Sequence, residues 1–106
     1  MRRRGPQHDE ALRALGGAVC ELRARNDLSQ EDLGRRVAMH RNYVGSVERG
    51  EANLGVLNLL RLVNALGVPF AEFAEVWERQ LRALQALQRA SADRTMHHAR
   101  QRQEAY

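Results

Sequence analysis

The chain has 106 residues, which is enough for one small domain and a short extension. Its formal net charge of +4 favours a polyanionic partner. All 17 basic residues are arginine, for which the base composition of the genome is the preferred explanation. The single cysteine excludes a disulfide framework, and no signal peptide or membrane-spanning run is evident, so we expect a cytoplasmic protein with no membrane partner.

The first elements expected are a basic arm and one helix. Residues 1–8 begin with MRRR and should form a flexible arm, which is either disordered or touches phosphate or the minor groove of a duplex. A helix is predicted within about residues 9–25, where apolar residues recur at helical spacing. These residues are Leu12, Leu15, Val19 and Leu22. Gly16-Gly17 interrupts the pattern, so the helix could start on either side of this pair. Cys20 lies among the apolar positions of this helix and is interpreted as a core thiol.

Residues 29–50 predict two short helices with a tight turn between them. Ser29 followed by Asp32 is close to a capping box, which marks the start of the first helix. The second helix is expected over about residues 40–48, and Gly50 in left-handed geometry should end it. His40 would stand at the cap of this second helix, where histidine is a poor choice.

The outward side of this second helix carries Arg41, Asn42 and Ser46, because Val44 and Val47 should turn inward. An arginine side chain pairs with N7 and O6 of guanine, an asparagine pairs with adenine, and a serine makes a weaker base contact. Arg41 and Asn42 could each reach a phosphate instead. The pattern indicates a helix that reads a DNA major groove.

Two further helices follow. The first covers about residues 57–66 and is closed by Gly67, and Pro69 opens the second. An apolar stripe continues along this last helix to about residue 89, past the reach of a small core. It consists of Trp77, Leu81, Leu84 and Leu87. The stripe predicts a homodimer interface, unless it folds back on its own chain, and residues 90–106 form a polar tail that either extends the helix or is loose.

Several separated segments, in order and at the right spacing, resemble one family, the lambda-repressor and Cro-like helix-turn-helix regulators, also called the xenobiotic response element (XRE) family. The matching segments are 28–33, Val37, Tyr43-Val44, Val47-Glu48-Arg49-Gly50, Asn53, Leu62, 65–68 and Phe73. The run from Tyr43 to Asn53 is most similar to controller proteins of restriction–modification systems. The resemblance implies an all-α fold, a compact five-helix domain with an extended C-terminal helix. Residues 9–76 would be the DNA-binding domain, 77–89 the helix extension and 90–106 the tail.

The resemblance also implies roles for individual residues. Gln30 would bind phosphate, and Arg49 and Asn53 would touch the DNA backbone from the loop, although Asn53 could equally hold that loop. Tyr43 would pack by its ring and offer its hydroxyl to phosphate, and His40 could tune affinity with pH or be a neutral polar residue. The candidate DNA-binding residues are therefore Gln30, His40, Arg41, Asn42, Tyr43, Ser46, Arg49 and Asn53.

Two other positions in the resemblance have structural meaning. Arg23 and Glu48 match a partly buried ion pair that fixes the recognition helix against the first helix. The chain departs from the family at Gly34, where alanine is usual, and glycine should cost up to about 1 kcal/mol in a helix. It departs again at Gly45, where a polar residue often contacts DNA.

These features predict a sequence-specific transcriptional regulator that binds double-stranded DNA at a short inverted repeat as a homodimer. The alternative is a helical protein–protein adaptor, such as an antitoxin-like partner built on the same fold. No enzyme is expected, because no cysteine or histidine set has zinc spacing and no glycine-rich phosphate loop follows a strand. The sequence points to no metal, cofactor or small-molecule ligand.

Overall fold

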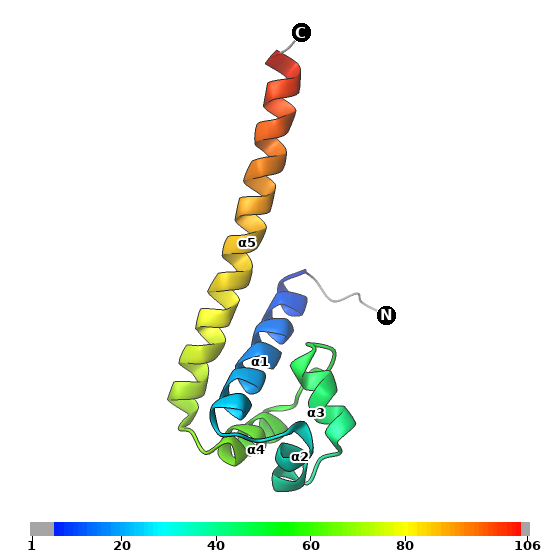
Figure 1. The fold of residues 1–106 in the computed structure, drawn as a ribbon, viewed down its shortest axis with the longest axis vertical. Coiled ribbons are helices and arrows are strands. Elements are labelled where there is room, and N and C mark those ends of the chain that lie inside the picture. The colour runs from blue at the N-terminus through cyan, green and yellow to red at the C-terminus, as the bar shows by residue number, and fades with distance from the viewer. Residues whose placement is uncertain (1–5, 105–106) are drawn as a thin grey trace.

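The computed structural model describes residues 6–104, with side chains over residues 9–94. The described chain is all-α, which confirms the predicted fold class, and no strand occurs within it. Its helices are α1 (Pro6–Arg25), α2 (Gln30–Val37), α3 (Arg41–Glu48), α4 (Val56–Leu66) and α5 (Phe70–Glu104). Helices α1 and α5 lie side by side, and α2, α3 and α4 gather around the lower half of α1 (Figure 1).

The start of α2 is held by the predicted capping box. The Ser29 hydroxyl accepts a hydrogen bond from the backbone N–H of Asp32 at 2.9 Å, and the Asp32 carboxylate accepts one from the backbone N–H of Ser29 at 3.0 Å. The hydrogen bond that the Asp32 carboxylate accepts from the backbone N–H of Ser29 is the largest cause that lowers the pKa of Asp32 to about 2, and the side chains of Ser29 and Arg35 add to it. Local sequence therefore fixes where α2 begins.

Helix α1 starts earlier than expected, at Pro6, and runs unbroken through Gly16-Gly17. The glycines serve close packing. A Cβ on Gly16 would lie 2.4 Å from the carbonyl oxygens of Val47 and Glu48, so the absence of a side chain lets α1 approach the end of α3. The residues predicted as the flexible arm, 1–8, are helical from Pro6 onward, and residues 1–5 lie outside the described part of the chain.

The expectation that Cys20 is a core thiol is wrong. The turn of α1 carries Cys20 to the exposed side of the helix, where its Sγ atom accepts a long hydrogen bond of 3.8 Å from Arg23. The buried positions of this part of α1 are instead Ala18, Val19 and Leu22. Apolar composition around a residue does not place it in the core when its helical phase turns it outward.

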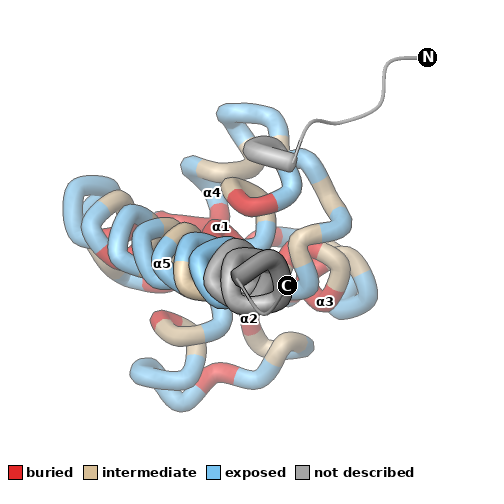
Figure 2. The backbone as a smooth tube through the Cα atoms, turned by 90° about the horizontal axis from the view of Figure 1, so that it is seen from above, coloured by how far each residue is buried: buried red, intermediate tan, exposed pale blue. Residues whose placement is uncertain are grey.

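The core lies where α1 meets the other four helices. Phe73 of α5 is fully buried at its centre and its ring is 6.2 Å from that of Trp77. The buried core residues are Leu15, Ala18, Val19, Leu22, Leu33, Val37, Val44, Val47, Leu62, Val63, Leu66, Phe73 and Val76. Figure 2 shows the buried segments in red among exposed turns. Burial of both α3 valines means that this core sets the position of α3.

Polar contacts fasten α5 to α1. The Glu21 carboxylate accepts hydrogen bonds from Arg79 and, at 3.0 Å, from Gln80. The hydrogen bond from Arg79 is the largest of several effects that together lower the pKa of Glu21. Trp77 donates its indole N–H to the carbonyl oxygen of Ala11 at 3.0 Å. The first turns of α5 are therefore part of the domain.

The remainder of α5 projects away from the domain (Figure 1). From Trp77 to Arg94 no residue is buried, and in Figure 2 the coloured turns of α5 next to its grey end are exposed or half-buried. The polar segment 90–106, which was expected to extend the helix or to be loose, continues α5 as far as Glu104. Within the described range no single helix is long and apolar enough to cross a membrane. Helices α4 and α5 reach that length and apolar character only as a pair, and the chain bends by 102° between them.

Candidate nucleic-acid interface

Helix α3 rests on the core by one face and presents the other to solvent. Val44, Gly45 and Val47 are buried, whereas Arg41 and Asn42 are exposed. The expectation that His40 caps this helix poorly is wrong, because its ring nitrogen Nδ1 accepts a hydrogen bond from the backbone N–H of Asn42 at 3.0 Å. This bond requires a neutral ring with an unprotonated Nδ1.

The turn between α2 and α3 depends on Gly34. A Cβ at this position would lie 2.5 Å from the carbonyl oxygen of Met39, and the backbone N–H of Met39 donates to the carbonyl oxygen of Gly34 at 2.8 Å. Ala38 ends α2 in the left-handed region with φ of 57°. The absence of a side chain at Gly34 thus permits this close approach of the Met39 carbonyl oxygen.

Side chains from α2, α3 and the residue after α3 meet around one shallow hollow. Its lining residues are Gln30, Arg41, Asn42, Gly45, Ser46 and Arg49. Gly45 makes room for its neighbours, because a Cβ there would lie 3.0 Å from Nη1 of Arg49 and 3.5 Å from Oε1 of Gln30. The structure therefore brings five of the eight predicted DNA-binding residues to one polar surface.

The predicted ion pair between Arg23 and Glu48 is present at the edge of this surface. Arg23 donates from Nε to Glu48 Oε2 at 2.7 Å and from Nη2 to Oε1 at 3.0 Å, and from Nη1 to the Leu28 carbonyl oxygen at 2.7 Å. The side chain of Arg23 is 18% exposed and that of Glu48 is 6% exposed. The hydrogen bonds that Arg23 donates to Glu48 are the largest cause of the raised pKa of Arg23. Gln30 donates its amide to the same carboxylate at 3.2 Å, so α1, α2 and α3 are joined through Glu48.

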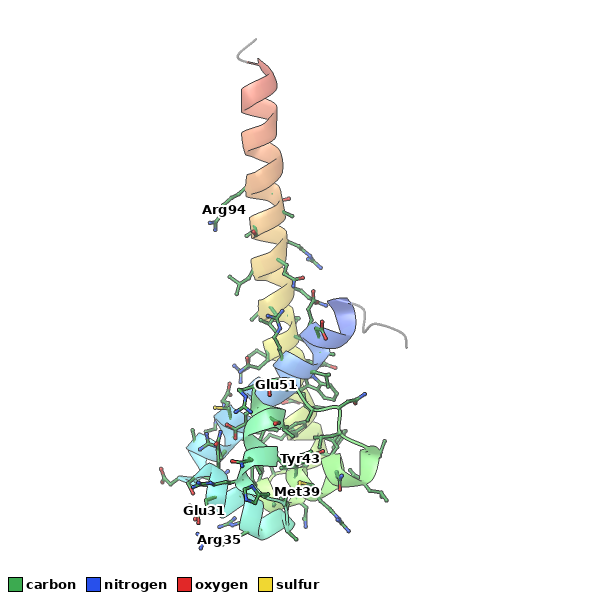
Figure 3. The ribbon with its side chains drawn as sticks, turned by 90° about the vertical axis from the view of Figure 1, so that its right-hand side faces the viewer. Glu31, Arg35, Met39, Tyr43, Glu51 and Arg94 are labelled. Atoms are coloured by element: carbon green, nitrogen blue, oxygen red, sulfur yellow. The ribbon has the colours of Figure 1, made fainter. Side chains whose placement is uncertain are left out.

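The other three candidate residues do not line this hollow. His40 borders a neighbouring hollow with Glu31, Arg35, Met39 and Arg41. Tyr43 is half-buried against the core, and Asn53 is exposed in the loop after α3. Figure 3 looks onto this side of the molecule, where Glu31 and Arg35 lie toward one end and Glu51 lies beyond Tyr43 toward the other.

Sequence reasoning did not identify Glu51 as part of this surface. Its carboxylate accepts two hydrogen bonds from Arg49, Nε to Oε1 at 3.1 Å and Nη2 to Oε2 at 3.2 Å. These bonds raise the pKa of Arg49. The signal available in the sequence was the spacing, because an acidic residue two positions after Arg49, across a helix-ending glycine, can fold back onto it.

The predicted dimer stripe on α5 divides into two parts. Trp77 packs on α1, Leu81 and Leu84 are half-buried, and Leu87 is 68% exposed. Other large apolar residues are exposed on α4 and at the start of α5, and we name this set the α4 patch. It consists of Val56, Leu57, Leu60 and Phe70, which are 72%, 76%, 46% and 45% exposed.

Comparison with known proteins identifies relatives over this same region. A helix-turn-helix family model matches residues 21–73, which are 53 of the 106 residues. Control protein C.SmaI of Serratia marcescens is 49% identical over 52 residues, which are 49% of this chain and 62% of that protein, slightly less than two thirds of its length.

Two solved structures share the fold. The restriction–modification controller protein C.AhdI from Aeromonas hydrophila has a TM-score of 0.60 and 39% identity, over 62% of this chain and 96% of that one. The clp gene regulator ClgR from Corynebacterium glutamicum has a TM-score of 0.70 and 26% identity, over 78% of this chain and 87% of that one. The sequence match and the shared architecture agree. This chain belongs to the helix-turn-helix family of lambda-repressor and Cro-like regulators.

Proposed function

We propose that this protein is a sequence-specific DNA-binding transcriptional regulator whose helix α3 enters the major groove of a short inverted repeat. It acts in the cytoplasm on double-stranded DNA, and it has no catalytic activity of its own. The proposal is supported by family membership and by relatives named as controller proteins and gene regulators.

The observation that carries the proposal is the shape of the α3 surface. Arg41 and Asn42 stand exposed at the N-terminal end of a helix whose opposite face is buried, which suits the insertion of that end into a groove. Arg41 is assigned to guanine and Asn42 to adenine, and Ser46 to a weaker base contact. Gln30 has a second amide hydrogen beyond the one given to Glu48, and it is assigned to phosphate beside the N-terminus of α2.

We propose that two copies bind the repeat through two-fold symmetry. A symmetric dimer places two recognition helices in successive major grooves about 34 Å apart. The α4 patch is the stronger candidate for the contact, because it has four exposed apolar residues, whereas the α5 stripe has only Leu87 fully free after Trp77 packs on α1. The contact predicted through Trp77, Leu81, Leu84 and Leu87 stays the alternative, and Leu87 is its most exposed residue.

The adaptor alternative would need an apolar docking surface on the motif itself. Among the residues whose side chains are described, the large exposed apolar residues belong to α4 and α5, and α2 and α3 contribute none. A polar surface with arginine, asparagine and glutamine groups suits a duplex better than the apolar face of a partner protein.

Selection of bound duplexes from a random DNA library tests this proposal. We expect recovered sequences to contain an inverted repeat with half-sites about one helical turn apart, and binding that weakens steeply with salt. Arg41→Ala should weaken binding of the selected duplex by about 1–3 kcal/mol and relax the preference at one base pair. Equal affinity for all duplexes, or affinity that does not change with salt, would contradict the regulator assignment.

A further inference from the structure

The guanidinium of Arg49 is already occupied in the free protein. Glu51 accepts two parallel hydrogen bonds from it at 3.1 and 3.2 Å, and the Ser46 hydroxyl lies 3.5 Å from Nη2. Both side chains of the ion pair remain open to solvent, at 59% and 58% exposure. The pair is therefore placed on the surface that faces a duplex, and it is not part of the core.

The backbone holds Glu51 in this position. The N–H of Gly50 donates to the carbonyl oxygen of Val47 at 3.0 Å, and the N–H of Glu51 donates to that of Ser46 at 2.9 Å. These two bonds form the Schellman ending of a helix, with Gly50 in the left-handed region at φ of 76°. Glu51 is thus fixed against the last turn of α3.

A carboxylate bound side-on to a guanidinium occupies the same donor fork that a phosphate would use. Arg49 also lines the hollow shared with Arg41 and Ser46, so this fork borders the candidate base-reading residues. We propose that Glu51 is an intramolecular competitor for DNA phosphate at Arg49, so that binding of a duplex must first separate this ion pair. The inference rests on the proposed function and concerns the regulation of the same surface.

The competitor should weaken binding moderately and without regard to sequence. Ion pairs exposed to solvent are weak, so release of Arg49 should strengthen duplex binding about two- to fivefold. The gain should be equal for the selected duplex and for a shuffled duplex of the same composition, because phosphate contacts carry no sequence information. A base contact by Glu51 would instead change binding of the selected duplex alone.

The test is a double-mutant cycle measured by fluorescence anisotropy with both labelled duplexes. The variants are Glu51→Gln, Arg49→Gln and the two combined, with Glu75→Gln as the control. Glu75 is an exposed acid on α5. Helices α5 and α3 lie on opposite sides of α1 (Figure 1), so removal of this charge reports the effect of net charge alone. Circular dichroism of each variant checks that the helices are retained.

We expect Glu51→Gln to bind both duplexes about two- to fivefold more tightly than Glu75→Gln does, and to give no gain when Arg49 is already glutamine. A gain that persists in the Arg49→Gln background would show plain repulsion of phosphate by Glu51 and overturn the inference. A gain no larger than the control, or one limited to the selected duplex, would also overturn it while the regulator assignment stands. If the unaltered protein binds neither the selected nor the shuffled duplex, both proposals fall.

Discussion

Replacement of Arg23 by methionine tests the ion pair that joins α1 to α3. The change keeps most of the side-chain volume but removes the guanidinium, so the Glu48 carboxylate, 6% exposed, keeps only the hydrogen bond from Gln30, and the Leu28 carbonyl oxygen loses its donor. Loss of one partner from a fully buried pair costs about 3–5 kcal/mol. Because Arg23 is 18% exposed, we expect the lower end, about 3 kcal/mol of unfolding free energy.

Thermal and urea denaturation followed by circular dichroism measure this cost. A loss of about 3 kcal/mol should lower the melting temperature of a domain this size by on the order of 12 °C or more. Arg25→Met is the matched control, because Arg25 lies on the same helix, is 53% exposed, and pairs with Glu21 at 2.5 Å, so it should cost well under about 1 kcal/mol. Addition of Glu48→Gln to Arg23→Met should recover about half of the loss by removing the unpaired charge. Equal losses for the Arg23 and Arg25 variants would refute the reasoning.

Three further predictions follow from the packing, the surface and the α2 cap. Gly16→Ala should destabilise the protein by about 1–3 kcal/mol in urea titration, because its Cβ would lie 2.4 Å from two carbonyl oxygens at the end of α3. Leu57→Asp should give monomers in analytical ultracentrifugation and Leu87→Asp should leave the dimer intact; the opposite result would move the interface to α5. The depressed pKa of Asp32, about 2, stabilises the fold fully above its ordinary value of 3.8, and this contribution is lost as pH falls toward 2. Asp32→Asn should therefore make the free energy of unfolding fall less steeply as the pH is lowered below 3.8. An unchanged pH dependence would contradict this contribution of Asp32.

Features that depend on neighbours in sequence were predicted well. The Ser29 capping box and the left-handed Gly50 are both present, because a cap or a helix stop is decided by residues within one turn of it. The two short helices of residues 29–50 lie within one or two residues of their expected bounds for the same reason. The Arg23–Glu48 pair joins residues 25 positions apart, and it was predicted only through the family resemblance.

Features that depend on how the helices pack against one another were not predicted. Gly16 looked like an interruption of α1, and only its contact with the end of α3 explains why glycine is tolerated inside a helix. Cys20 looked buried because its neighbours are apolar, but its helical phase turns it outward. The hydrogen bond from the indole N–H of Trp77 to the carbonyl oxygen of Ala11 in α1 was likewise not predicted from the sequence. For Gly16 and Trp77 the deciding partner lies far along the chain, whereas for Cys20 the helical phase of α1 decides.

The shortness of α3 has an evolutionary consequence. Eight residues are too few to form a stable helix in isolation, so its order comes from the valines it buries and from the contacts at its ends. Arg41 and Asn42 take no part in that anchoring through their side chains. Substitution at these two positions leaves the scaffold intact, so descendants of this protein can diverge toward new binding sites without loss of the fold.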